Sequence, residues 1–272
     1  MIKYGGIWMS TFSREHIEFL KKKKKKKYFI LFWQIIIIVL FLAIWEYLSY
    51  KKIINTFLFS SPSNIYRCLV GLYNNGDLFN HISITVYETI ISFLLANIIG
   101  LIVGTILWWN NTIAKIADPY LTIINSLPKV ALGPLIIIWV GASINSIIFM
   151  ALMISSIISI INIYNSFIST DENFVTLMKS FKSSKWQLYT KVVIPSNISN
   201  IINNFKINIS MSLIGVIMGE LLVSKKGLGY LIMYGSQVFN INLVIASVFV
   251  LGILSYFMYY VIHLIEKKVE KK

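Results

Sequence analysis

The chain has little charge for its size. Charged residues make up 13% of its 272 residues, about half the share in a soluble globular protein, while 57% are hydrophobic. This imbalance excludes a water-soluble enzyme. Glycine (14 residues) and proline (5 residues) are also too few for a collagen-like or low-complexity chain.

Residues that build catalytic or metal centres are scarce. The single cysteine, Cys68, cannot form an internal disulfide or a C-x-x-C pair. The three histidines, His16, His81 and His263, form no H-E-x-x-H cluster, and no serine lies in a G-x-S-x-G context. No G-x-x-x-x-G-K-[ST] motif is present to hold nucleotide phosphates. The sequence therefore predicts a protein that is not an enzyme and carries no metal or cofactor of its own.

Acidic residues are outnumbered by basic ones. The 25 Lys and Arg against 11 Asp and Glu give a net charge of +14. Seven of the lysines form one run, residues 21–27, directly before an apolar stretch. Lysines beside a membrane-spanning helix anchor it against anionic lipid on the cytoplasmic side. No soluble module with a basic, aromatic-rich face is visible, so we expect no nucleic-acid partner.

Long apolar runs dominate the sequence. A helix needs about 20 mostly apolar residues to cross a bilayer, and period-2 alternation of a membrane β-barrel is missing. We therefore predict an all-α, polytopic membrane bundle of six helices. The predicted spans are residues 28–50, 82–109, 117–140, 144–164, 201–223 and 243–265.

The distribution of Lys and Arg predicts the orientation in a cell membrane. With the N-terminus in the cytoplasm, 18 of the 25 basic residues lie inside and five outside, so both termini are predicted to be cytoplasmic. Ser63 is expected to cap a short surface helix in the external loop. The predicted organisation is a basic tail (1–27), an N-terminal span (28–50), an external loop (51–80), a five-helix core (81–266) and a basic C-terminal tail (267–272).

A cytoplasmic loop at residues 170–195 is predicted to form two helices. Thr170 is the expected N-cap of the first. Ser184 and Gln187 have capping-box spacing for the second, which is expected to end before Pro195. The first helix carries a one-sided apolar stripe that either packs on the protein's own helix ends or docks onto a cytoplasmic partner. The stripe consists of Phe174, Leu177, Met178 and Phe181.

Four segments in order resemble one family. The stretch LMKSFKSSKWQLYTKVVIP (177–195) looks like the EAA loop of permease subunits in bacterial ATP-binding-cassette (ABC) importers. SPSNIY (61–66), SLPKVALGPLIIIWVG (126–141) and GELLVSKKGLGYLI (219–232) resemble motifs of the subgroup that imports nitrate, sulfonates, taurine and related compounds. The resemblance covers the chain from about residue 60 to the C-terminus.

The loop departs from the family pattern at two places. Thr176, Leu177 and Met178 occupy the Glu-Ala-Ala positions, and Lys182 occupies the glycine of the tight turn. A non-glycine residue at positive φ costs about 1 kcal/mol. The turn is therefore either built differently, with help from its serines, or matched by the partner. The resemblance implies an ATPase-coupling site made of Thr176, Leu177, Met178, Phe181, Lys182, Ser183, Ser184 and Pro195.

The resemblance also implies partners and a mechanism. It implies the fold of a type I ABC importer permease, with five core helices and one N-terminal helix, working as a homodimer. A cytoplasmic ABC ATPase dimer would bind ATP and Mg²⁺, and an external substrate-binding protein would deliver the solute. A sulfonate, taurine, nitrate or a vitamin precursor are the candidate solutes. The alternative is a secondary carrier, or another polytopic membrane protein, without an ATPase partner.

Polar residues within the spans are candidates for the translocation pathway. We name Pro128, Lys129, Pro134 and Glu220. The two prolines interrupt a helix, and Lys129 either provides a cationic lining for an anionic solute or snorkels or pairs with Asp118.

Other polar or small residues in the spans are expected to be structural. Glu88 is expected to make a structural hydrogen bond, and Lys206 to snorkel. Two G-x-x-x-G pairs, at residues 100 and 104 and at 215 and 219, are interpreted as helix-packing contacts.

Overall fold

The structure, a computed structural model, describes residues 14–269, and over that range it contains helices joined by turns and no strand. The predicted all-α class is therefore confirmed. The outermost residues of the two predicted basic tails, 1–13 and 270–272, lie outside the described part. The chain divides into two compact units, Met1–Asn64 and Ile65–Lys272, which are described separately.

The first unit is dominated by one long helix, α1 (Arg14–Tyr50), which includes the lysine run. A short helix, α2 (Thr56–Phe59), and the start of α3 (Pro62–Asn74) follow. The Glu46 carboxylate accepts hydrogen bonds from the Ser63 backbone N–H (3.0 Å) and hydroxyl (2.7 Å). Because Ser63 is bound in this way, the predicted Ser63 cap is wrong. Ser61 instead accepts the Asn64 N–H at 3.2 Å, with a proline as the first helical residue.

The second unit contains the predicted core. Helices α4, α7, α11 and α13 are long and apolar enough to cross a membrane, as is α1 in the first unit. Such segments are helical because lipid cannot satisfy backbone hydrogen bonds. The bounds are α4 (Asp77–Trp109), α5 (Asn111–Ser126), α6 (Gly133–Val140), α7 (Ile144–Ile168), α11 (Ile198–Val223), α12 (Leu228–Gln237) and α13 (Ile241–Val269).

The third predicted span is not a straight helix. It is broken into α5 and a second part, Lys129–Val140, that are bent by 82° to one another. The second part consists of a 3₁₀ turn, η2 (Lys129–Leu132), and α6. The break lies at Leu127, whose extended backbone precedes Pro128, because the residue before proline avoids the helical conformation.

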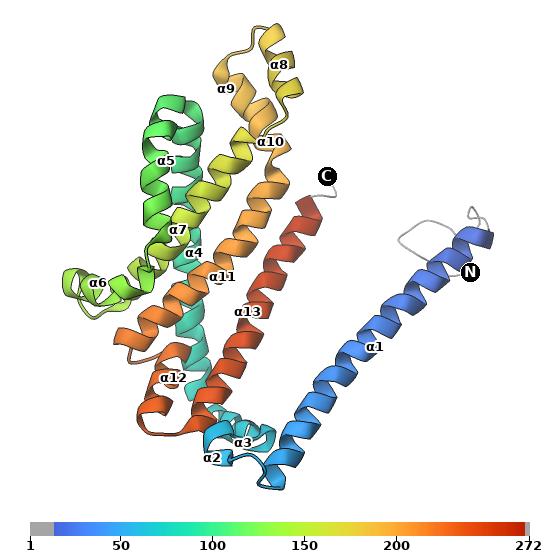
Figure 1. Cartoon of the computed structure of the whole chain (residues 1–272), viewed down its shortest axis with the longest axis vertical. Coiled ribbons are helices and arrows are strands. Elements are labelled where there is room, and N and C mark those ends of the chain that lie inside the picture. Colours follow the sequence, from blue (N-terminus) through green and yellow to red (C-terminus); the bar gives the residue numbers. More distant parts are fainter. Residues whose placement is uncertain (1–13, 270–272) are drawn as a thin grey trace. The chain divides into compact units, whose positions relative to one another are not determined.

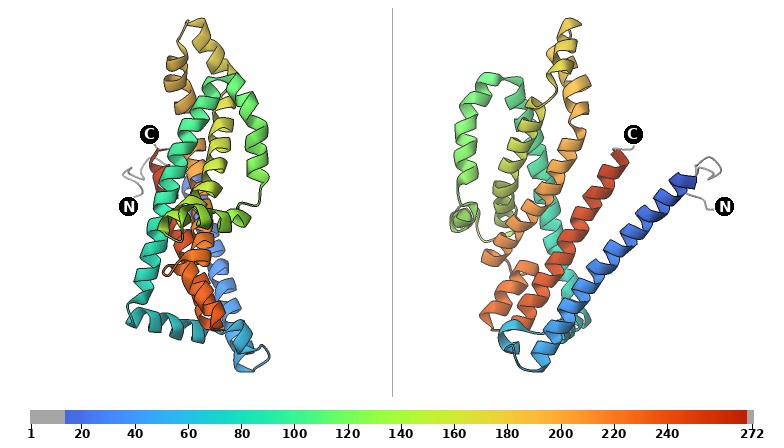
Figure 2. Two further views of the ribbon diagram at one scale, coloured as in Figure 1. Left: turned by 90° about the vertical axis from the view of Figure 1, so that its left-hand side faces the viewer. Right: turned by 45° about the vertical axis from the view of Figure 1, so that its right-hand side comes forward.

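Helix α7 packs between α4 and α11, and glycines make both contacts close (Figures 1 and 2). A Cβ atom on Gly100 would lie 2.1 Å from the Ser159 hydroxyl, and one on Gly215 would lie 2.5 Å from the Ala151 Cα. A Cβ on Gly104 would lie 2.9 Å from the Ile163 side chain, and one on Gly219 would lie 2.8 Å from the Ile147 side chain, both on α7. The two G-x-x-x-G pairs therefore serve helix packing, as predicted.

Two ends of the second unit carry different connections (Figure 1). At one end lie the turn from α4 to α5 and the elements of the 170–195 loop. In that turn Asn110 ends α4 and caps α5, accepting the Thr112 and Ile113 N–H groups. Helix α12 lies at the opposite end. The loop elements are α8 (Glu172–Ser180), α9 (Lys185–Leu188), a π-helical turn η3 (Tyr189–Val193) and α10 (Ile194–Ser196).

Candidate functional site

The 170–195 loop forms two helices, but its first cap differs from the prediction. Asp171, not Thr170, caps α8, and its carboxylate accepts the Asn173 N–H at 2.8 Å. The Thr170 side chain is buried and instead donates to the Phe167 carbonyl and accepts from the Asn197 amide. The second cap is confirmed, because Ser184 and Gln187 form a reciprocal capping box.

The helical path does not end before Pro195 as predicted. The chain continues through the π turn and α10, and Pro195 lies in the first turn of α10. In the π turn the Ile194 N–H donates to the Tyr189 carbonyl, five residues back. Pro195 has no N–H with which to continue the helical hydrogen bonds, and α10 ends one residue later, at Ser196.

The turn between α8 and α9 keeps the conformation that the family's glycine would adopt. Lys182 has a φ of 51°, in the left-handed region. The Ser183 N–H donates to the Met178 carbonyl at 3.1 Å, which is the helix-ending bond of a Schellman motif. The first alternative, a turn that is built differently, is therefore not what the structure has. The turn has the left-handed conformation, with a lysine in place of the glycine.

The loop presents apolar side chains to its surroundings. Phe181 at the end of α8 is 73% exposed and Trp186 on α9 is 62% exposed. Phe174 and Leu177 on α8 are exposed as well, and Met178 is half-buried. Thr176 and Lys182 are also exposed. An apolar face of this kind marks an interaction surface.

A cluster of aromatic rings around one lysine attaches the loop to the end of α4. We call it the tryptophan cluster; it consists of Trp108, Trp109, Lys185, Trp186 and Tyr189. The Lys185 ammonium donates to the Trp109 carbonyl and lies 5.6 Å from the centres of both the Trp108 and the Trp109 rings. It therefore neutralises the negative end of the α4 dipole and adds cation–π contacts.

Tyr189 anchors the tryptophan cluster in the bundle. Its ring lies 5.3 Å from that of Trp108, and its hydroxyl lies 2.7 Å from the Thr105 hydroxyl on α4. Sequence reasoning missed this cluster. The available signal was the Trp-Trp pair at the end of a predicted span, with Lys185 and Trp186 in the loop.

Lys129 lies at the break between α5 and α6. Its ammonium donates to the Asn125 backbone carbonyl at 2.9 Å and to the Asn125 side chain at 3.3 Å. The lysine thus caps the end of α5, where the break leaves a carbonyl without its helical partner. Within residues 14–269, Lys129 forms no ion pair, so the alternative pairing with Asp118 is not found. Pro128 and Pro134 flank it, both exposed.

Glu220 is fully buried at the opposite end of the second unit. One carboxylate oxygen accepts the Thr85 hydroxyl at 2.6 Å, and the other accepts the Gly229 N–H at 2.5 Å. Thr85 in turn accepts the Leu228 N–H at 2.9 Å, and His81 Nδ1 accepts the Gly227 N–H at 2.9 Å. We call this arrangement the carboxylate clamp: His81, Thr85 and Glu220 hold the three N–H groups that begin α12.

The glycines of the 227–229 turn are required by the carboxylate clamp. Gly227 has a φ of 107°, and a Cβ there would lie 2.3 Å from the Glu220 carboxylate. A Cβ on Gly229 would lie 2.8 Å from the Glu220 Cβ. The Glu88 carboxyl hydrogen-bonds to Glu220, so the structural hydrogen bond expected of Glu88 is found.

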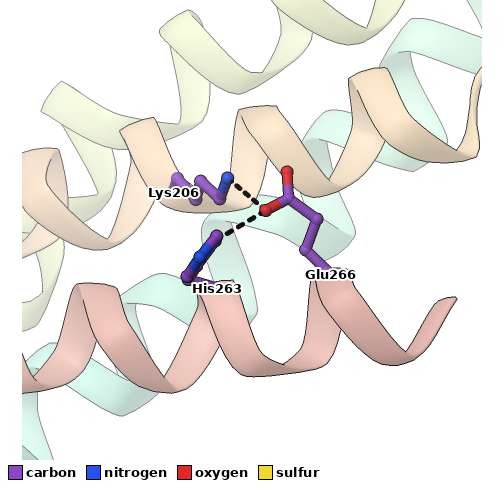
Figure 3. Close-up of polar contacts among 3 residues, drawn as sticks. All are labelled: Lys206, His263 and Glu266. Atoms are coloured by element: carbon purple, nitrogen blue, oxygen red, sulfur yellow. Dashed lines mark hydrogen bonds and ion pairs between the residues drawn. The ribbon is translucent and has the colours of Figure 1, made fainter. Parts of the chain in front are cut away.

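Lys206 does not snorkel as predicted. Its ammonium pairs with the Glu266 carboxylate at 2.5 Å, and His263 Nδ1 lies 2.8 Å from the same oxygen (Figure 3). The Lys206 and Glu266 side chains are almost buried, at 13% and 11% exposed. A nearby acid on α13 satisfies the charge better than a path to the membrane surface.

Comparison with known proteins supports the resemblance. Residues 96–271 match the family described as binding-protein-dependent transport system inner membrane components. The chain is 25% identical to the putative aliphatic sulfonates transport permease SsuC of Bacillus subtilis, over 85% of this chain and 83% of the relative. It is 26% identical to the formylaminopyrimidine transport permease ThiX of Halalkalibacterium halodurans, over 79% of this chain and 86% of the relative.

Solved structures with a similar fold are also transporter subunits. A chain of the inward-facing MetNI methionine ABC transporter superposes with a TM-score of 0.64 at 18% identity, covering 71% of this chain and 96% of that one. A chain of an amino acid ABC transporter gives a TM-score of 0.58 at 15% identity, covering 74% of this chain and 97% of that one. At these identities the likeness establishes the fold.

Proposed function

Because this chain belongs to the family of binding-protein-dependent transport system inner membrane components, we propose that its 170–195 loop binds the ATPase subunits that power transport. The chain is the multi-pass permease subunit of an ABC importer in the cell membrane. In our proposal ATP and Mg²⁺ bind to a separate cytoplasmic ATPase dimer. An external binding protein delivers the solute to the opposite face.

The exposed apolar face of the loop carries the proposal of ATPase coupling. Phe181 and Trp186 are the most exposed apolar side chains of α8 and α9. They stand on a Schellman turn and a capping box, so the face keeps its shape without a partner. Rigid presentation of aromatic anchors lowers the entropy cost of binding. The loop residues that we assign to coupling are Thr176, Leu177, Met178, Phe181, Lys182, Ser183, Ser184 and Pro195.

The broken span supports a pathway between two copies of the chain. Apolar residues of α5 and α6 are exposed, among them Tyr120 (64%), Ile138 (76%) and Trp139 (72%). A backbone break at membrane depth needs cover from protein or a water-filled cavity. We propose that a second copy of the chain covers the break and that a water-filled pathway lies between the two copies. Pro128, Lys129 and Pro134 line this pathway in our proposal. Glu220 contributes to the pathway indirectly, because it holds the start of α12 in place.

We propose a small anion as the solute. Lys129 lies at a break that two prolines flank, and among residues 14–269 no carboxylate pairs with it. Helix α6 also begins beside it, and the start of a helix favours negative charge. The sulfonate permease among the relatives is consistent with this charge preference.

Co-purification tests the ATPase coupling. We expect Phe181→Glu to release the ATPase from the purified permease, because the substitution places a charge on the docking face. Phe239→Glu is the matched control, since Phe239 is 71% exposed and lies just after α12, away from the loop. A permease that purifies without any ATPase before substitution would instead favour a secondary carrier.

Uptake by reconstituted vesicles tests the solute class. We expect Lys129→Met to reduce uptake of an alkylsulfonate or nitrate at least tenfold, and Lys129→Arg to retain most of it. Uptake of a neutral aminopyrimidine is measured in parallel. If only the pyrimidine is transported, or if Lys129→Met leaves anion uptake unchanged, the anion proposal is wrong.

A further inference from the structure

Four buried polar atoms between α4 and α11 have no hydrogen-bond partner within the described part of the chain. They are Glu88 Oε2 and Ser92 Oγ on α4, and Asn208 Oδ1 and Ser212 Oγ on α11. All four side chains are at most 1% exposed. Nearly all buried polar atoms in proteins are paired, so four such atoms on facing helices indicate a bound ligand.

The register of the two helices brings these atoms into one strip. Thr85 bonds to Glu220, and Asn97 accepts from the Asn208 amide at 3.0 Å. Thr85 and Asn97 are twelve residues apart on α4, and Asn208 and Glu220 are twelve residues apart on α11. The two helices therefore run antiparallel, and the two bonds are about 18 Å apart along both of them. Ser92 and Ser212 therefore lie between these two bonds, at about the same height.

Direct hydrogen bonds bound the strip on both sides. On one side is the carboxylate clamp, with Glu88 bonded to Glu220. On the other side Asn97 accepts from Asn204 and Asn208, and Asn204 also donates to the Ser159 hydroxyl at 3.0 Å. Within residues 14–269, the buried polar atoms without a direct partner lie in the stretch between these two networks, so a polar ligand fits there.

We propose that ordered water molecules bind in this strip, which we call the α4–α11 seam, and bridge Glu88, Ser92, Ser212 and Asn208. Water suits the atoms because the serine hydroxyls offer both donors and acceptors, while Asn208 Oδ1 accepts only. Buried waters typically make about three bonds to such groups. The atoms are spread over several helical turns, too far apart to form the coordination shell of one cation at 2.3–2.6 Å.

The α4–α11 seam makes the α4–α11 contact different from the contacts of α7. Glycines press α7 directly against both helices, and any side chain there collides. Water-bridged contacts exchange partners within a small displacement, whereas close-packed contacts do not. Between its two directly bonded ends, the α4–α11 contact is therefore held by water, whereas the contacts of α7 are held by close backbone approach. This inference does not depend on the proposed solute or ATPase.

Serine-to-alanine variants of the full chain in detergent test the proposal. Removing a water-binding hydroxyl leaves the bridging water short of a partner, so Ser92→Ala and Ser212→Ala should each lower the melting temperature by about 2–4 °C. The double variant should lose less than the sum, because the two hydroxyls share water. Ser155→Ala is the matched control: Ser155 is fully buried, but its hydroxyl bonds to its own helix at Ala151.

Hydroxyl-radical footprinting of the unmodified chain gives a second readout, since bound water delivers radicals to buried side chains. Phe93 and Leu213, which are next in sequence to the two serines, should be labelled several-fold more than the similarly buried Ile160 and Leu107, which belong to an apolar cluster. Support requires both results. The proposal is overturned if either serine variant is neutral or stabilising relative to the control. Labelling of Phe93 and Leu213 no higher than that of the apolar cluster also overturns it.

Discussion

The carboxylate clamp and the tryptophan cluster both fasten a connection to the end of a long helix, and they do so by opposite means. The carboxylate clamp satisfies three backbone N–H groups with buried side chains, and its glycines leave no room for a side chain. The tryptophan cluster relies on rings in tilted and edge-on contact and on one exposed lysine, and Trp186 is 62% exposed. Buried polar bonds are costly to break, whereas exposed cation–π contacts contribute little.

This difference suits the two connections to different tasks. A connection held by buried bonds keeps one geometry. A connection held by partly exposed rings leaves those rings within reach of a partner. The start of α12 is therefore the sealed end of the second unit, and the 170–195 loop is its accessible end. The predictions below test this contrast, starting with the largest expected effect.

Removing the clamp carboxylate should have the largest effect. Glu220→Ala leaves the Gly229 N–H and the Thr85 hydroxyl without their buried partner, so we expect a loss of about 3 kcal/mol in the free energy of unfolding. Chemical denaturation in detergent measures it. Glu172→Ala, at an exposed acid in the first turn of α8, should cost only a few tenths. Equal losses for the two variants would remove the contrast.

The alkylation rate of Cys68 shows whether the destabilisation caused by Glu220→Ala is confined to the surroundings of the carboxylate clamp. It packs half-buried beside Leu228, Leu231 and Leu243 at the start of α12 and α13. Burial raises the pKa of its thiol, so alkylation should be slow at neutral pH and accelerate as pH rises and thiolate forms. We expect Glu220→Ala to accelerate alkylation about tenfold at fixed pH and Lys185→Met to leave it unchanged. Acceleration by both variants would mean that the two ends are coupled.

The Schellman turn of the loop offers a stabilising substitution. Lys182 holds a left-handed conformation that costs a side chain about 1 kcal/mol. Lys182→Gly should therefore raise the melting temperature by a few degrees, and Lys182→Ala should not. Because Lys182 is exposed and outside the tryptophan cluster, the rate of Cys68 alkylation should stay the same. A loss of stability with glycine would show that the lysine side chain is itself bound.

Lys185 should have the smallest effect on stability. Lys185→Met removes the cation above two rings and should cost about 0.5–1 kcal/mol, while Lys185→Arg should restore most of it. The informative measurement is the number of ATP molecules hydrolysed per solute transported by the assembled transporter. We expect this ratio to rise in Lys185→Met by more than the small loss of stability explains. An unchanged ratio would assign Lys185 to stability alone.

Most of the architecture could be predicted from the sequence. Apolar run length predicts the spans, and the spacing of Ser184 and Gln187 predicts a cap that depends only on neighbouring residues. The predictions that failed concerned helix caps whose side chains bond to a residue distant in the sequence instead of to the start of their own helix. Thr170 lost its capping role to a contact with Asn197, and Ser63 lost its role to Glu46.

The site residues divide in the same way. Sequence motifs located the 170–195 loop and the break at Pro128, because proline and helix periodicity act locally. The carboxylate clamp joins residues that are up to 146 positions apart, and the tryptophan cluster joins Lys185 to a carbonyl 76 positions away. Nothing in a single sequence pairs such residues. Lys206 shows the same limit, since its partner Glu266 lies on another helix.

The 82° break has a consequence for the membrane as an electrical barrier. Helix α5 has 16 residues and is about 24 Å long, shorter than the roughly 30 Å hydrocarbon layer. The peptide groups around Pro128 therefore lie where the bilayer would otherwise insulate one compartment from the other. This short stretch must therefore be covered to keep ions from crossing there, a requirement separate from passing the solute.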